Sequence, residues 1–86
     1  MEKRVIFTHH AEKKLSLLVQ HGFRFSKREI ENIVQAPLRI RPGYMGRKVA
    51  EDIISEEHLL RVIYEELPRE LKIITMYPAR RKRYEG

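Results

Sequence analysis

The 86-residue sequence has no cysteine and no tryptophan. The absence of cysteine excludes disulfide bonds, thiolate zinc sites and cysteine nucleophiles. There is no hydrophobic run long enough to cross a membrane, and Val5-Ile6-Phe7 is too short to be the apolar region of a signal peptide. We therefore expect a protein with no membrane segment, for which the cytoplasm is the default compartment.

Amide side chains are also scarce, since Gln20, Asn32 and Gln35 are the only ones. Charged residues make up 35% of the chain, and many charges with few thermolabile residues favour a thermophilic source. A chain of this length forms one domain, residues 1–86. It is expected to bury only about 60–65% of the surface of its unfolded chain, so the core is small.

Positive charge is in excess, with a net charge of +6, and it is unevenly distributed. Residues 1–50 carry a net +7, residues 51–71 a net −5 and residues 72–86 a net +4. A basic surface concentrated in two segments favours an anionic partner such as nucleic acid.

The first part of the chain predicts a strand and two helices. Arg4–Phe7 is a short apolar strand, and Thr8 is a good N-cap for a helix over residues 9–21. Ser26 and Glu29 form a capping box that opens a second helix, which Pro37 ends. Apolar residues at helical spacing define the buried stripes: Ala11, Leu15, Leu18 and Val19 in the first helix, and Ile30, Ile33 and Val34 in the second.

The rest of the chain has the pattern of strands. The predicted strands are residues 38–41, 47–54, 58–65 and 71–77. The short turns between the later strands predict an antiparallel meander, and Pro78 is expected to end the last strand. The fold class is therefore α+β, with two N-terminal helices packed on one face of a sheet of four or five antiparallel strands.

The strand over residues 58–65 has two different faces. Leu60, Val62 and Tyr64 share the face expected to pack against the helices, while Arg61 lies on the other face between apolar neighbours. This second face is either a partner-binding surface, a homodimer contact included, or a shallow active site. Arg61 itself could pair with Glu51 or Glu65 at adjacent positions, or hold a phosphate with its planar guanidinium group.

Two groups of cations are candidates for binding nucleic acid. Each has a structural alternative: the first could be a solvated tail, and the second could keep an edge strand soluble. The first group is Arg80, Arg81, Lys82 and Arg83, followed by Tyr84, whose ring could stack on a base. The second is Arg39, Arg41, Arg47 and Lys48, on either side of the turn over residues 42–46.

Histidine is the side chain best suited to proton transfer near neutral pH. His9 and His10 open the first helix, where the helix dipole favours a neutral ring that can act as a base. Alternatively, one packs beneath the sheet edge and the other is solvated. Adjacent residues of a helix diverge by about 100°, so the two histidines do not suggest a metal site, and no cofactor is expected.

Several segments resemble the RelE/ParE-like toxin superfamily, and most closely its small prokaryotic domains of unknown activity. They are Thr8-His9-His10-Ala11, Ser26 to Glu29 with the closing Ala36-Pro37, Leu60 to Glu65, and Thr75 to Tyr84. The resemblance implies a compact fold of two helices and four or five strands. For RelE-like members it also implies metal-independent cleavage of ribosome-bound mRNA, with an antitoxin protein as partner.

The resemblance also implies site residues. Arg61 and one arginine of the C-terminal cluster, with Arg81 as the choice, match the catalytic cations by location. Tyr84 matches the catalytic tyrosine, with Tyr77 as a rival, and His9 and His10 are added for proton transfer. The predicted function is a toxin-like RNA-binding protein that acts as an endoribonuclease. The alternatives are a non-catalytic binding module of a toxin–antitoxin pair and a domain with no toxicity.

Overall fold

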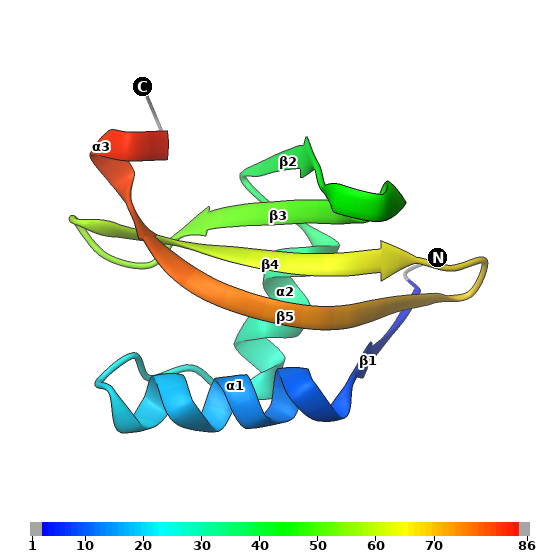
Figure 1. The fold of residues 1–86 in the computed structure, drawn as a ribbon, viewed down its shortest axis with the longest axis horizontal. Helices are drawn as coiled ribbons and strands as arrows, with labels where there is room; N and C mark the ends of the chain where they lie inside the picture. The colour runs from blue at the N-terminus through cyan, green and yellow to red at the C-terminus, as the bar shows by residue number, and fades with distance from the viewer. Residues whose placement is uncertain (1–2, 85–86) are drawn as a thin grey trace.

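The computed structural model describes the backbone of residues 3–84 and the side chains of residues 3–82. It is an α+β fold with a five-stranded sheet (Figure 1). The elements in chain order are β1 (Arg4–Phe7), α1 (His9–Gln20), α2 (Lys27–Gln35), β2 (Arg39–Pro42), a 3₁₀ turn η1 (Tyr44–Gly46), β3 (Lys48–Ile53), β4 (His58–Glu66), β5 (Glu70–Arg80) and α3 (Arg81–Tyr84).

Both main helices begin at the residues that the sequence predicts. The Thr8 hydroxyl accepts a hydrogen bond from the Ala11 amide at 3.1 Å, and Ser26 and Glu29 form the complete capping box. These bonds satisfy amides that have no partner inside the helix. Gly22 follows α1 with φ +94°, a conformation that favours glycine, and the helix ends there.

The sheet is mixed, so the prediction of an entirely antiparallel sheet is wrong for one strand. The strand order is β1-β5-β4-β3-β2, and the neighbours from β5 to β2 are antiparallel as expected. β1 pairs parallel with β5, with Arg4 beside Glu70 and Phe7 beside Ile73. Short turns dictate the orientation of the later strands, whereas two helices separate β1 from the rest, and no local turn orients it.

Pro78 does not end the last strand, which continues to Arg80. β1 lies beside β5 only from Glu70 to Ile73, so beyond Ile73 that side of β5 is a sheet edge within the described residues. Proline is tolerated at an edge because no neighbouring strand needs its missing N–H there. Because β5 extends to Arg80, α3 lies at the end of the sheet next to the β3–β4 turn. There the Arg81 amide donates a hydrogen bond to the Glu57 carbonyl.

The core joins both helices to one face of the sheet. α2 passes behind the strands in Figure 1, and α1 lies beside β1 and β5. The buried residues of this cluster are Ala11, Leu15, Leu18, Ile30, Ile33, Val34, Ala50, Leu60, Val62, Tyr64, Leu71, Ile73 and Met76. Leu60, Val62 and Tyr64 therefore face the core as predicted. Val19 is an exception to the predicted stripe of α1, because it is exposed.

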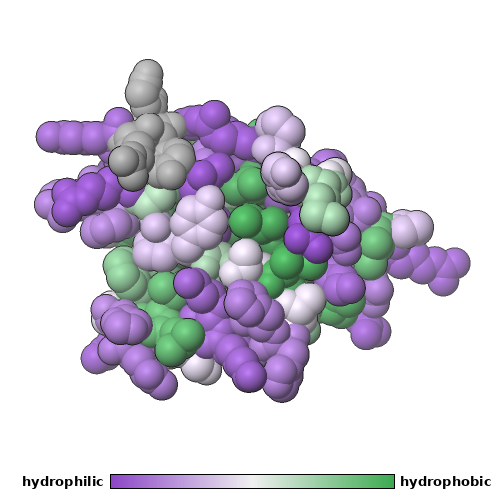
Figure 2. Space-filling model, in the orientation of Figure 1, coloured by the Kyte–Doolittle hydropathy of each residue, from purple (hydrophilic) through white to green (hydrophobic). Residues whose placement is uncertain are grey.

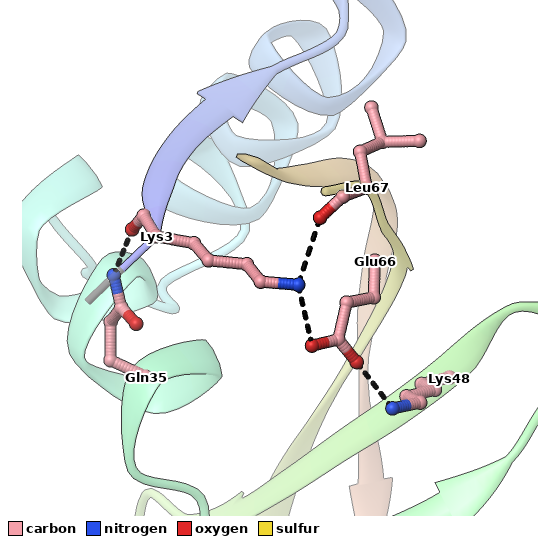
Figure 3. Close-up of polar contacts among 5 residues, drawn as sticks. All are labelled: Lys3, Gln35, Lys48, Glu66 and Leu67. Carbon is pink, nitrogen blue, oxygen red and sulfur yellow. Dashed lines mark hydrogen bonds and ion pairs between the residues drawn. The ribbon is translucent and has the colours of Figure 1, made fainter. Parts of the chain in front are cut away.

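A polar network ties β1 to the ends of three other elements (Figure 3). The Lys3 ammonium donates to Glu66 Oε2 at 2.9 Å and to the Leu67 carbonyl at 2.8 Å, while Lys48 donates to the other oxygen of Glu66. The Gln35 amide at the end of α2 donates to the Lys3 carbonyl at 2.6 Å. The hydrogen bonds from Lys3 and Lys48 lower the pKa of Glu66 to about 2.

Among the described helices, there is none whose length and apolar character would let it span a lipid bilayer.

Candidate functional site

Side chains from four strands form one row on the face of the sheet opposite the core, which we call the open face. The strand register places Arg39 beside Glu51, Glu51 beside Arg61, and Arg61 beside Tyr77. Cross-strand partners point to the same side of a sheet, so these four side chains are neighbours. Arg41 is two residues from Arg39 and shares its face. We call Arg39, Arg41 and Arg61 the arginine cluster.

Glu51 lies at the centre of this cluster and is only 2% exposed. The Nε atom of Arg61 is 2.9 Å from Glu51 Oε2, while the Nε atoms of Arg41 and Arg39 are 3.1 Å and 3.8 Å from Oε1. A buried carboxylate is tolerated because cations surround it. Three guanidinium groups thus face one buried carboxylate.

Arg61 also contacts an aromatic ring. Its guanidinium carbon is 5.5 Å from the centre of the Tyr77 ring, which is the distance of a cation–π interaction. The Arg61 side chain is 14% exposed, so it is held between the ring on one side and Glu51 on the other. These two contacts fix the orientation of the planar guanidinium group.

The open face also carries apolar side chains, as the sequence predicts. Leu59 and Val49 are buried although they point away from the helices, and Ile63 is half-buried. Figure 2 shows hydrophobic residues gathered over the middle of the sheet, with hydrophilic residues around them. The accessible apolar area beside the cations therefore comes from half-buried Ile63 and from Ile53, which is 43% exposed, rather than from Leu59 and Val49.

The second predicted group of cations lies on the hairpin of β2 and β3, which we call the basic hairpin, and its members have two different sets of partners. Arg39 and Arg41 join Arg61 in the arginine cluster. Arg47 lies 3.9 Å from Glu65, and Lys48 pairs with Glu66 in the network that ties β1 to the sheet. The hydrogen bond and the charge of Glu66 raise the pKa of Lys48.

The C-terminal cations lie at one end of the sheet. Arg80, Arg81 and Lys82 line a small hollow of about 150 Å³ together with Glu56 and Glu57. The Arg81 guanidinium donates to the backbone carbonyls of Ser55 at 3.5 Å and Glu56 at 3.3 Å. Arg81 therefore holds the β3–β4 turn rather than pointing towards Arg61. The side chains of Arg83 and Tyr84 lie outside the described residues.

The two candidate histidines open α1, which belongs to the helical layer. Both are exposed, and Thr8 anchors the start of their helix to β5 through its hydrogen bond to the Ile74 carbonyl at 3.1 Å. Arg61 points to the opposite face of the sheet. The structure thus brings Arg61 together with Arg39, Arg41 and Tyr77, and leaves His9 and His10 on another side of the molecule.

Sequence reasoning did not foresee that the basic hairpin and Arg61 form one site. The link between them is Glu51, which is an acid in the otherwise apolar middle of β3. A charged residue at a position expected to be buried is a sequence signal, since it requires partners. The strand register decides which cations pair with Glu51, and the register cannot be read from the composition.

The second hollow is an open groove of about 830 Å³ between the end of α2 and strands β2 to β4. Its lining includes Val34, Ile40 and Tyr64, and the ion pair of Lys48 with Glu66 lies at its rim. Burial raises the pKa of the Tyr64 hydroxyl group. Across residues 3–82, no group of three histidine or carboxylate side chains is placed to hold a metal ion.

Comparisons with models of protein families, with curated proteins and with solved structures found no match. The chemistry of the open face is therefore the main guide to function.

Proposed function

We propose that this protein binds RNA on the open face of its sheet, in the manner of a toxin-like RNA-binding protein. The observation that carries the proposal is the convergence of Arg39, Arg41 and Arg61 on buried Glu51, next to the ring of Tyr77. Guanidinium groups neutralise phosphates, and an aromatic ring can stack on a base. The basic segments of the sequence add long-range attraction for a polyanion.

Single-stranded RNA suits this surface better than a small anion does. The cations lie on β2 and β4, and apolar side chains lie between and beside them. A lone phosphate would use only the charges, whereas a strand with unstacked bases can also cover the apolar area. The ribosome, as a partner that presents mRNA, belongs to the same proposal.

The likeness to RelE/ParE toxins is part of this proposal, and so is an antitoxin protein as partner. The resemblance implies a compact fold of two helices and four or five strands, and two main helices and five strands are compatible with it. Cleavage of ribosome-bound mRNA would need proton transfer at the phosphate held by Arg61. His9 and His10 lie in the helical layer and Arg81 holds a turn, and this placement favours the non-catalytic alternative of a binding module.

Titration of a fluorescent single-stranded RNA at several salt concentrations tests the binding. Arg61→Gln should weaken binding and lower the slope of log K against log salt by about 0.7 for each phosphate that is no longer neutralised. Arg28→Gln is the matched control, because Arg28 is an exposed arginine of α2 in the helical layer. Equal slopes for wild type and Arg61→Gln, with both proteins folded, would contradict the proposal.

Cleavage has a separate test. Primer extension on cellular mRNA after induced expression should show new 5′ ends if the protein is a nuclease. The double variant His9→Ala/His10→Ala should then weaken cleavage more than binding, because general acid–base groups typically contribute about 10²–10⁴-fold. RNA binding without new ends would leave the binding module as the function.

A further inference from the structure

The tip of the β2–β3 hairpin exposes two large apolar side chains next to each other. Tyr44 is 87% exposed and Met45 is 78% exposed, which are the highest values among the exposed large hydrophobic residues of the described chain. Neither side chain contributes to the core. Paired exposure of this kind on a small protein marks a binding surface more often than a folding requirement.

The turn that presents them is closed and strained. The Gly43 amide donates to the Arg47 carbonyl at 2.7 Å, and the Arg47 amide donates to the Tyr44 carbonyl at 3.1 Å. Met45 has φ 58° and ψ 38°, a left-handed conformation that side chains other than glycine and asparagine rarely adopt. A Cβ atom on Gly43 would lie 2.9 Å from the Arg47 carbonyl oxygen, so this close approach requires glycine. The hydrogen bonds close the backbone of the turn on which the two apolar residues lie.

Three cations flank the tip along the hairpin, each within ion-pair distance of a carboxylate, and one of them belongs to the arginine cluster. Arg41 precedes the turn on β2, and Arg47 and Lys48 follow it. Because Arg41 contacts Glu51 in the arginine cluster, one hairpin carries both the exposed ring and a cation of the proposed RNA surface. The complementary ligand has negative charge and a flat apolar face, which is the description of a nucleotide.

We propose that Tyr44 and Met45 form a platform on which one unpaired base of RNA stacks, while the adjacent phosphates lie on the arginine cluster. The inference rests on the proposed RNA binding and adds a position at which one base is held, on the hairpin tip outside the arginine cluster. Bases in a duplex are already stacked, so only an unpaired base can offer its face to the tyrosine ring.

The test uses the full chain and a fluorescent oligouridine that is single-stranded. Tyr44→Ala should weaken binding about 5- to 100-fold, which is the range for loss of one base–aromatic stack. Tyr44→Phe should bind within about twofold of wild type, because it keeps the ring. Leu17→Ala is the matched control, since Leu17 is an exposed apolar residue of α1, 49% exposed. The salt slope of Tyr44→Ala should equal that of wild type, because the same phosphates are still neutralised.

A second arm of the test removes the base instead of the ring. An oligonucleotide with one abasic position should lose affinity for wild type but not for Tyr44→Ala. If Tyr44→Ala binds as tightly as wild type while Arg61→Gln binds weakly, the stacking inference is overturned and the RNA-binding proposal stands. If wild type itself binds no RNA, the proposed function fails. A change in oligomeric state of Tyr44→Ala with unaltered RNA affinity would assign the tip to self-association and overturn the inference.

Discussion

Glu51 is the residue on which the open face depends. It is an acid at a buried position of β3, and it is tolerated only because three arginines surround it. The arginines also need it, because three cations brought together without a counter-charge would repel one another. A single carboxylate therefore stabilises the fold and holds the three guanidinium groups together.

Glu51→Gln should lower the free energy of unfolding by about 3 kcal/mol. Breaking a buried ion pair costs about 3–5 kcal/mol, and the lower end applies because Arg39 and Arg41 reach solvent. Urea unfolding at neutral pH measures the change. Glu65→Gln is the control, since its contact with Arg47 is long, at 3.9 Å, and both side chains are only half-buried, so the change should cost less than about 1 kcal/mol. Equal losses for the two variants would show that burial of Glu51 does not matter.

At the level of elements, the strand and helix ends are joined by polar contacts rather than by the core alone. Glu66 at the end of β4 accepts hydrogen bonds from two lysines. One is Lys3, which precedes β1, and the other is Lys48 at the start of β3. Gln35 at the end of α2 donates a hydrogen bond to the Lys3 carbonyl, which joins the helical layer to the same network (Figure 3). β1 is only four residues long, so these contacts help to hold it in its parallel pairing with β5.

This network makes stability depend on pH in the acid range. The pKa of Glu66 is about 2 in the folded protein, against an ordinary value of 4.5, so the folded state favours the charged form. The contribution is fully present above about pH 4.5 and is lost as the pH falls towards 2. Urea unfolding between pH 2 and 6 should therefore show a steeper acid loss for wild type than for Glu66→Gln.

Removing one of the two donors gives the control for this effect. Lys3→Met should make the acid loss smaller than in wild type, but still larger than in Glu66→Gln, because Lys48 remains. Superimposable profiles of wild type and Glu66→Gln would contradict the role given to the network.

At the scale of the whole molecule, charge is arranged so that cations occupy the open face and one end of the sheet. The acidic residues of the middle segment pair with cations of the same chain. Glu51, Glu65 and Glu66 form ion pairs, and Glu56 and Glu57 lie beside the C-terminal cations. Exposed cations of the helical layer, among them Lys13, Arg24 and Arg28, also contribute to the net charge of +6.

The C-terminal cations should contribute to RNA affinity through charge alone. Alanine at Arg80, Arg81, Lys82 and Arg83 should flatten the salt dependence of RNA binding, while a variant with lysine at the three arginines should keep it. The comparison uses the same titration at several salt concentrations. An alanine variant with the wild-type slope would mean that this end of the sheet is only solvated and that the open face alone binds.

Local signals in the sequence predicted most of the elements. Thr8, Ser26 with Glu29, and Gly22 mark helix ends through bonds and conformations that involve only nearby residues. The alternation of Leu60, Val62 and Tyr64 with Arg61 likewise indicated which face of β4 is buried. The end of β5 was predicted wrongly, because whether a proline stops a strand depends on whether a neighbouring strand needs its N–H.

The sequence by itself determined the helices, the later strands, the basic character and the presence of an arginine on a half-apolar sheet face, because each follows from spacing, capping or composition. Only the tertiary structure decided that β1 runs parallel to β5, that Arg39 and Arg41 meet Arg61 around Glu51, and that Arg81 holds a turn. The physical reason is that pairing partners and register are set by contacts between residues far apart in the chain, which compete across the whole fold.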